Sequence, residues 1–308
     1  MQHNKPVFTM LVGLPYSGKS VYAERLAKET GAVIHSSDAI REEILGDIQD
    51  QTQNANVFDE LHRRVRHDLS ECKSVIYDAT NINYKRRMHV LQMFGKQDYE
   101  KVCVLMATPF EECIERSKYR DRVVPYEVLT RMYKSIWIPH KYEGWDDVQI
   151  VYPGAGCFNS IASMLDGTNG LFQVPQDNPH HTLTVGEHCR KTYDLIDSED
   201  SKLLLAALLH DIGKPFTKSF VNSKGEVTDV AHYYDHHHVS AYDSLFYFDH
   251  TSDDFALDVA AIIQWHMRPF ELNKMADPAK SKEKLKALIG SYLYDSVMKL
   301  HDADIKAH

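Results

Sequence analysis

One eight-residue segment restricts the fold of this chain more than any other part of the sequence. Residues 13–20, GLPYSGKS, fit the pattern G-x-x-x-x-G-K-[ST] and lie between the apolar run Phe8–Val12 and a helical stretch that begins near Lys19. In a strand–loop–helix unit of this kind, backbone N–H groups and the helix N-terminus surround phosphate oxygens. The residues expected to hold ATP or another nucleoside triphosphate are Gly13, Ser17, Gly18, Lys19 and Ser20, the last with its hydroxyl on Mg²⁺.

The first half of the chain alternates short apolar runs with helical periodicity. The predicted strands are Val7–Val12, Val33–His35, Val75–Tyr77, Val102–Met106 and Val148–Val151, and the predicted helices are Lys19–Glu29, Val57–Cys72, Tyr84–Phe94, Phe110–Arg116 and Tyr126–Lys134. This alternation predicts an α/β domain with a mostly parallel sheet flanked by helices.

The composition changes near the middle of the chain. From Pro153 to Pro179 it is rich in Gly, Pro, Asn and Ser, and nearly every later segment has helical periodicity. The predicted later helices are Val185–Ile196, Lys202–His210, His236–Phe248, Phe255–Trp265 and Lys282–Leu293. We therefore expect a first domain over residues 1–152, a linker over 153–172 and an all-α domain over 173–308.

Bulk composition excludes several classes of protein. Apolar runs are far shorter than the ~20 residues of a membrane span, and the N-terminus has no signal-peptide pattern, so a cytoplasmic protein is expected. Five scattered cysteines without a CxxC pair argue against a disulfide framework or a thiolate zinc site. The net charge of −9 limits nucleic-acid contacts to local basic groups. These groups are Arg63, Arg64 and Arg66, then Lys85, Arg86 and Arg87, then Arg116, Lys118, Arg120 and Arg122.

Polar residues follow two of the predicted strands. Asp38 and Arg41 come after Val33–His35, and Asp78 and Asn81 come after Val75–Tyr77. Because open α/β sheets bind ligands at the carboxyl ends of their strands, these side chains should lie beside the phosphates. Asp38 also suits a helix N-cap, and Asn81 could cap the following helix.

Together with the basic stretch Glu115–Arg122 and the helix VPYEVLTRMYKS at 124–135, these motifs make the segment from Phe8 to Gly144 resemble the phage-type polynucleotide 5′-kinases. The resemblance implies that Asp38 accepts the proton of a 5′-hydroxyl, Arg41 grips the phosphate of the terminal nucleotide and Asp78 orients the acceptor. It further implies that Arg120 is a lid residue over the transferring phosphoryl group. Arg122 is a rival for that role, because the following segment is one residue shorter than the family pattern. Arg116, Lys118 and Arg122 suit a solvated helix face as well as a nucleic-acid backbone.

A second set of chemistry-bearing residues follows the linker. In chain order it reads His188, His210-Asp211, His236, His266 and Asp304. Imidazoles and carboxylates on separate helices can converge on divalent ions, which activate water and polarise phosphoryl oxygens. This half resembles the HD phosphohydrolases, and the motifs NPHH at 178–181 and HMRP at 266–269 resemble the HD domain of bacterial CCA-adding enzymes.

That resemblance implies one metal on His188, His210, Asp211 and Asp304, and a second site completed by His236 and His266, with Mn²⁺, Ni²⁺ or a similar ion. Lys214 and His181 would then contact substrate phosphate. Two positions stay open, since His237 and His238 adjoin His236 and Asp302 is a rival to Asp304.

The two resemblances together imply a bifunctional enzyme of nucleic-acid end healing. Its kinase would phosphorylate 5′-hydroxyl ends, and its hydrolase would remove 2′,3′-cyclic phosphate or 3′-phosphate, preparing broken RNA, in preference to DNA, for an RNA ligase. One rival is a small-molecule nucleoside or nucleotide kinase fused to a nucleotide-hydrolysing HD domain. A second rival is a nucleotide-sensing regulator with a structural metal.

Overall fold

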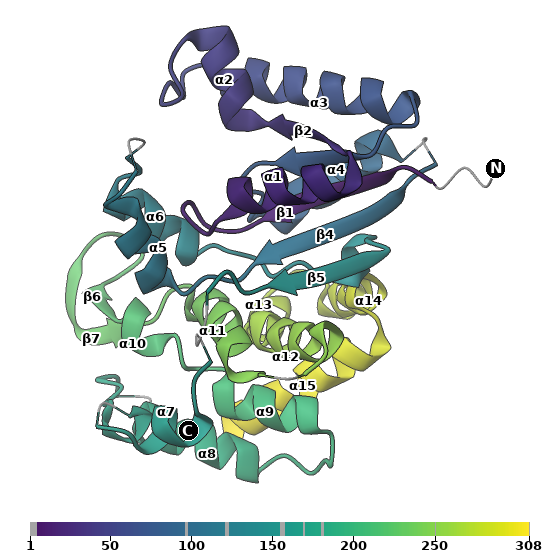
Figure 1. Ribbon diagram of the computed structural model, residues 1–308. Coiled ribbons are helices and arrows are strands. Elements are labelled where there is room, and N and C mark those ends of the chain that lie inside the picture. Colours follow the sequence, from purple (N-terminus) through teal and green to yellow (C-terminus); the bar gives the residue numbers. More distant parts are fainter. Residues whose placement is uncertain are drawn as a thin grey trace. The chain divides into compact units, whose positions relative to one another are not determined.

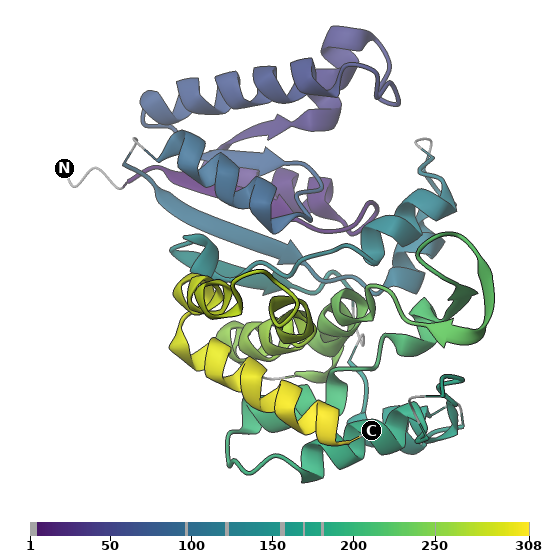
Figure 2. The same ribbon diagram turned by 180° about the vertical axis from the view of Figure 1, so that it is seen from behind.

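The computed structural model describes residues 5–95, 98–120, 123–154, 158–168, 170–179, 182–249 and 251–307. The chain divides into two compact units, each formed by two separate parts of the sequence. The first unit comprises Met1–Met132 and Glu143–Ala155, and the second comprises Tyr133–Tyr142 and Gly156–His308. Figures 1 and 2 show both units from opposite sides.

A five-stranded parallel sheet is the centre of the first unit (Figure 1). Its strands are β1 (Val7–Val12), β2 (Val33–Ser36), β3 (Val75–Asp78), β4 (Glu100–Met106) and β5 (Asp147–Val151), in the spatial order β2-β3-β1-β4-β5. The β-branched, apolar composition of these strands suits a sheet that is buried on both faces. The order brings the loop after β1 to the middle of the sheet edge, between the ends of β3 and β4.

Helices cover both faces of this sheet, as Figures 1 and 2 show for α1 and α4. The helices of the first unit are α1 (Lys19–Thr30), α2 (Ser37–Leu45), α3 (Asn54–Ser70), α4 (Tyr84–Phe94), α5 (Phe110–Ser117) and α6 (Tyr126–Tyr133), the last ending at the unit boundary. Leu26 of α1 packs with Leu11, whereas Phe94 of α4 packs edge-on against Phe8, 5.7 Å away between ring centroids. Alternate residues of β1 therefore anchor the two layers.

The second unit is built mainly from helices. They are α7 (Ile161–Asp166), α8 (Val185–Asp194), α9 (Ser201–Leu209), α10 (Lys214–Thr217), α11 (His236–Ser244), α12 (Asp253–Trp265), α13 (Arg268–Leu272), α14 (Pro278–Ile289) and α15 (Ser291–Lys306). Helix α12 is deeply buried, since Val259, Ile262 and Ile263 have no exposed surface. Among the described residues, no helix is long and apolar enough to cross a membrane.

The predicted fold class, an α/β domain followed by a helical domain, is confirmed. Several details differ from the sequence-based prediction, which has no helix at α7, α10 or α13 and none over most of α15. A short antiparallel hairpin, β6 (Ser219–Val221) and β7 (Val227–His232), interrupts the second unit, with Gly225 in its turn at φ 83°. The predicted helix Lys282–Leu293 is wrong in its extent, because Gly290 at φ 84° ends α14 and α15 begins directly after it.

Candidate functional site

The loop between β1 and α1 in the first unit has the geometry of a phosphate cradle. Gly18 is left-handed at φ 94°, a conformation that favours glycine, and α1 begins at the next residue. A Cβ on Gly13 would lie 2.7 Å from the Ser17 hydroxyl, so the loop is also closely packed. Lys19 folds back over the loop, with Nζ donating to the carbonyls of Gly13 at 2.9 Å and Leu14 at 2.6 Å. A bound phosphate would therefore take the place of these two carbonyls as the partner of the Lys19 ammonium.

Ser20 and Asp78 meet beside this loop. The Ser20 hydroxyl donates to Asp78 Oδ2 at 3.1 Å, although the two residues are 58 positions apart in sequence. Burial raises the pKa of the Asp78 carboxyl, while the charge of Lys19 and the Ser20 hydrogen bond oppose that rise. A hydroxyl and a carboxylate beside a triphosphate loop are the oxygen ligands that Mg²⁺ accepts.

Asp38 and Arg41 form one pair on α2. Arg41 Nη1 donates to Asp38 Oδ1 at 2.7 Å and Nη2 donates to Asn54 Oδ1 at 2.9 Å, while the guanidinium is only 4% exposed. Asp38 is about one-third exposed and lies in the first turn of the helix, whose N-cap is Ser36. Ser36, not Asp38, is therefore the N-cap residue, in contrast to the alternative that the sequence allowed.

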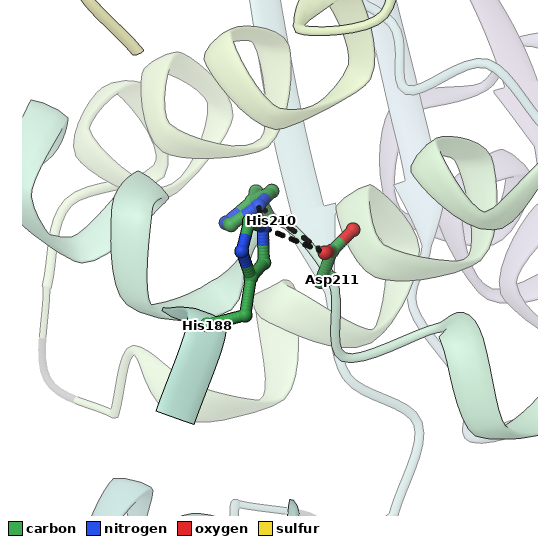
Figure 3. A group of neighbouring side chains, drawn as sticks. All are labelled: His188, His210 and Asp211. Carbon is green, nitrogen blue, oxygen red and sulfur yellow. Dashed lines mark hydrogen bonds and ion pairs between the residues drawn. The ribbon is translucent and has the colours of Figure 1, made fainter. Parts of the chain in front are cut away.

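Four charged or imidazole side chains converge inside the second unit. They are His188 on α8, His210 and Asp211 after α9, and Asp304 on α15, each no more than 5% exposed. His188 Nε2 lies 3.0 Å from Asp304 Oδ1, 3.4 Å from Asp211 Oδ2 and 3.3 Å from His210 Nε2. Figure 3 shows His188, His210 and Asp211 directed at one centre.

Asp211 also faces a second group of imidazoles. Its other oxygen, Oδ1, lies 3.2 Å from Nε2 of His236, the first residue of α11. His236 Nε2 is in turn 3.3 Å from Nε2 of His266, which follows α12. The ligand atoms of Asp211, His236 and His266 all lie within 4.8 Å of one another, as do those of His188, His210 and Asp211. One carboxylate is therefore shared by two adjacent groups.

The donor set fits divalent transition metals. His210, His236 and His266 each point Nδ1 at the carbonyl three residues earlier, at 2.8, 2.7 and 2.6 Å respectively. A carbonyl only accepts hydrogen bonds, so Nδ1 carries a hydrogen in each of these three rings, and Nε2 is the atom that faces the cluster and would bind a metal ion. Histidines that bind metals have this arrangement. Imidazole with carboxylate suits Mn²⁺, Fe²⁺, Ni²⁺ or Zn²⁺.

Comparison with known proteins divides the chain in the same order as these two sites. Residues 8–137 match the family model described as AAA domain, and residues 180–306 match the model described as HD domain. The chain joins a kinase-like AAA domain to an HD domain. No match was found among curated proteins.

Several solved structures resemble part of the chain. A protein described as a kinase from Chloroflexus aurantiacus is 16% identical, with 49% of this chain and 90% of that chain covered and a TM-score of 0.41. A chain of the Pnkp1/Rnl/Hen1 RNA repair complex is 20% identical, with 42% and 44% covered and a TM-score of 0.39. The APS kinase CysC of Mycobacterium tuberculosis is 23% identical, with 37% and 69% covered and a TM-score of 0.30. This chain therefore spans less than half of the RNA repair chain.

Several basic residues of the first unit are paired within it. Arg63 and Arg64 bind Glu60, Lys118 binds Glu115, and Arg116 binds Glu112 and the Pro153 carbonyl. Arg87 is only 1% exposed and forms a buried ion pair with Glu143. Arg87 is therefore a core residue that neutralises Glu143, in contrast to what the basic run at 85–87 suggests from sequence.

A cavity of about 490 Å³ adjoins the phosphate loop of the AAA domain. Gly18, Tyr22, Arg116 and Arg120 are among its lining residues, together with Tyr152 at the end of β5. The proposed lid residue Arg120 is exposed at its rim. The rival lid residue Arg122 lies outside the described residues.

The HD domain geometry separates the alternatives left by the sequence. Asp304 is 5% exposed and contacts His188, whereas Asp302 is exposed. Of the neighbouring histidines, His236 faces the cluster, and His238 accepts a hydrogen bond from Gln264 instead.

In the first unit, the sequence allowed Asn81 as the cap of the following helix. The side chain that caps α4 is Asn83, while Asn81 donates to the Leu11 carbonyl.

Lys214 lies against the cluster. Its ammonium is 2.6 Å from Asp211 Oδ2 and donates to Gln176 Oε1 at 2.7 Å. Gln176, like Asn54 in the AAA domain and Gln264 on α12, was not singled out from sequence, because a lone amide carries no spacing signal. His181, the expected partner of Lys214 at the substrate phosphate, lies outside the described residues.

The charge states in the HD domain follow from burial and neighbouring groups. Burial disfavours the ionised form of Asp211, but His210 and Lys214 outweigh it and hold its pKa well below the ordinary value. Burial likewise disfavours the charged form of His210, but Asp211 and Cys189 together outweigh it and hold the pKa of His210 well above the ordinary value. Burial, with His210 and His236, lowers the pKa of His266 to about 3. The cluster thus offers an ionised carboxylate and a neutral imidazole, while His210 holds a proton that a metal ion would displace.

Proposed function

We propose that this chain heals broken nucleic-acid ends, with the AAA domain as a polynucleotide 5′-hydroxyl kinase and the HD domain as a 2′,3′-cyclic phosphodiesterase and 3′-phosphatase. The observation that carries the proposal is the Asp38–Arg41 pair at the carboxyl edge of a sheet that also holds a triphosphate loop. A base and a phosphate-binding cation side by side suit an acceptor whose hydroxyl lies next to a phosphodiester.

In the kinase reaction, Asp38 accepts the proton of the attacking 5′-hydroxyl and Arg41 holds the phosphate of the terminal nucleotide. Lys19 leaves the loop carbonyls to neutralise the β- and γ-phosphates, and Arg120 covers the transferring group. Ser20 and Asp78 would hold Mg²⁺, which offsets charge on the phosphate oxygens. Because phosphoryl transfer depends chiefly on position and charge, these residues account for the main requirements of the reaction.

In the hydrolase reaction, His188, His210, Asp211 and Asp304 would hold one divalent ion, and Asp211, His236 and His266 a second. Bound ions of this kind lower the pKa of water and polarise a phosphoryl oxygen. Lys214 is not a metal ligand, but its ammonium lies 2.6 Å from Asp211 Oδ2, so it contributes by orienting and neutralising the substrate phosphate. The resulting 5′-phosphate and 3′-hydroxyl ends suit an RNA ligase, which we propose acts next, in the cytoplasm.

The test uses one RNA that carries both a 5′-hydroxyl and a 2′,3′-cyclic phosphate, incubated with Mn²⁺, with or without ATP, and resolved by gel. Asp38→Ala should abolish phosphorylation and spare phosphate removal, whereas Asp211→Asn should do the reverse. Glu42→Ala on α2 and Asp302→Ala on α15 are matched controls, because both residues are exposed. If either change at Asp38 or Asp211 removed both activities, the two-site proposal would be wrong.

A second candidate is a small-molecule kinase joined to a nucleotide hydrolase. The net charge of −9 and the local pairing of Arg63, Arg64 and Arg116 favour it, because these three basic groups are paired with carboxylates of the chain rather than open to a long nucleic-acid backbone. Labelled ATP offered together with a 5′-hydroxyl oligonucleotide and free nucleosides decides between the two. Preferential labelling of a nucleoside would rule out end healing.

A further inference from the structure

The segment Tyr133–Tyr142 lies between α6 and β5 in sequence but packs as part of the second unit. The AAA match ends at residue 137 and the HD match begins at 180, so the segment straddles the end of one match and precedes the other. Ile136 and Ile138 are buried within the second unit, at 0% and 2% exposure. The segment therefore belongs to the second unit, although it precedes the last strand of the first unit in the sequence.

One buried amide ties this segment to two helices. Gln264 on α12 is 2% exposed, and its Oε1 accepts from the Ile138 N–H at 2.9 Å. Its Nε2 lies 3.0 Å from the Ile136 carbonyl and 2.8 Å from Nδ1 of His238 on α11, and it donates to both. Both hydrogens and the oxygen of the amide are therefore used, which fixes its orientation.

Trp137 packs between the same two helices. Its ring lies edge-on to His238 at 4.9 Å and to Trp265 at 4.7 Å, measured between ring centroids. His238 is two residues after the proposed ligand His236, and Trp265 directly precedes the proposed ligand His266. The segment therefore contacts the two helix ends that carry one half of the cluster.

We infer that Tyr133–Tyr142 is a positioning element for the second metal subsite, and that it acts through its own Trp137 and through Gln264 of α12. The inference rests on the proposed two-metal function of the HD domain. His236 and His266 must keep their Nε2 atoms 3.3 Å apart while they belong to different helices. Their Nδ1 bonds reach only to carbonyls three residues earlier in the chain, whereas Gln264 and Trp137 fix one helix against the other. Groups that orient ligands in this way typically change metal affinity about 10- to 100-fold.

The test measures Mn²⁺ binding to the intact two-domain chain, with calorimetry and electron paramagnetic resonance as the two readouts. The wild type should bind two ions per chain and give the spectrum of an exchange-coupled pair. Gln264→Leu and Trp137→Ala should weaken one ion about 10- to 100-fold, leave the other unchanged and give a mononuclear spectrum. Trp137→Phe should restore the coupled spectrum, because a ring still separates the two helices. Lys141→Ala, which removes a surface ion pair of the same segment with Asp254, should behave as wild type.

The inference would be overturned if Gln264→Leu and Trp137→Ala both bound two Mn²⁺ ions with wild-type affinity and gave the spectrum of an exchange-coupled pair. Equal weakening of both ions would overturn it as well. If a variant melts below the assay temperature, Gln264→Asn carries the same expectation, because it shortens the amide by one methylene and keeps the helix intact. A wild type that binds no Mn²⁺ at all, or only one ion, would instead refute the proposed two-metal function.

Discussion

Replacing Glu143 by Gln should strongly destabilise the AAA domain. Arg87 and Glu143 are each fully buried at the side chain, with Arg87 Nε 2.8 Å and Nη2 2.5 Å from the carboxylate oxygens. The substitution keeps the shape of the side chain but leaves the guanidinium without a counter-charge. Removing one partner of a buried pair costs about 3–5 kcal/mol of unfolding free energy. For a unit of this size that lowers the melting temperature by roughly 6–20 °C.

The loss of stability should be greatest around β1 and the phosphate loop. Arg87 also donates to the Asn81 carbonyl at 2.8 Å, and Asn81 donates to the Leu11 carbonyl two residues before Gly13. Hydrogen–deuterium exchange should therefore rise in peptides from β1 and the phosphate loop, alongside a lower melting temperature by scanning calorimetry. Glu43→Gln is the control, because its carboxylate is exposed and its partner Arg64 is partly exposed, and it should shift the melting temperature far less.

A melting temperature for Glu143→Gln within about 2 °C of wild type would refute the reasoning, since the pair would then carry less than about 1 kcal/mol. The double variant Arg87→Met/Glu143→Leu provides a further check. Because it removes both charges together, it should be more stable than Glu143→Gln.

Two further predictions concern the sites themselves. Asn54→Ala removes one partner of Arg41 and should raise KM for a 5′-hydroxyl oligonucleotide about tenfold with little change in kcat. The control Asn56→Ala, at an exposed neighbour, should change neither constant. A fall in kcat alone for Asn54→Ala would contradict the substrate-binding role of Arg41. Because the pKa of His210 is raised, Mn²⁺ must displace a proton, so affinity should fall about tenfold per pH unit on acidification. Calorimetry in buffers of different ionisation enthalpy measures that proton, and pH-independent binding would contradict it.

Much of the architecture follows from local patterns. The loop at Gly13–Ser20 fixes its flanking strand and helix, and the β-branched runs gave all five strands of the sheet to within two residues at each end. The order of histidines and aspartates predicted a cluster, and the six side chains do converge. These signals are readable because the chemistry demands particular residue types at short spacing.

Other features depend on long-range packing and leave no local trace. Arg87 sits in a basic run typical of a solvated surface, and only its distance to Glu143, 56 residues later, reveals it as a core residue. Gln264 lies in an apolar helix where a single amide has no periodic meaning. The choice between Asp302 and Asp304 depends on which helix face is buried, and sequence left both open. The hairpin at β6 and β7 is too short for a period-two pattern to stand out.

Each unit is built from two separate parts of the sequence, and this has a consequence for folding during synthesis on the ribosome. The backbone at Ile138 hydrogen-bonds to Gln264, which is translated 126 residues later. At about 5–20 residues per second, the buried Ile136 and Ile138 therefore remain without their final partner for roughly 6–25 seconds. A nascent chain that stalls before α12 would carry this apolar stretch uncovered, immediately upstream of the edge strand that completes the sheet.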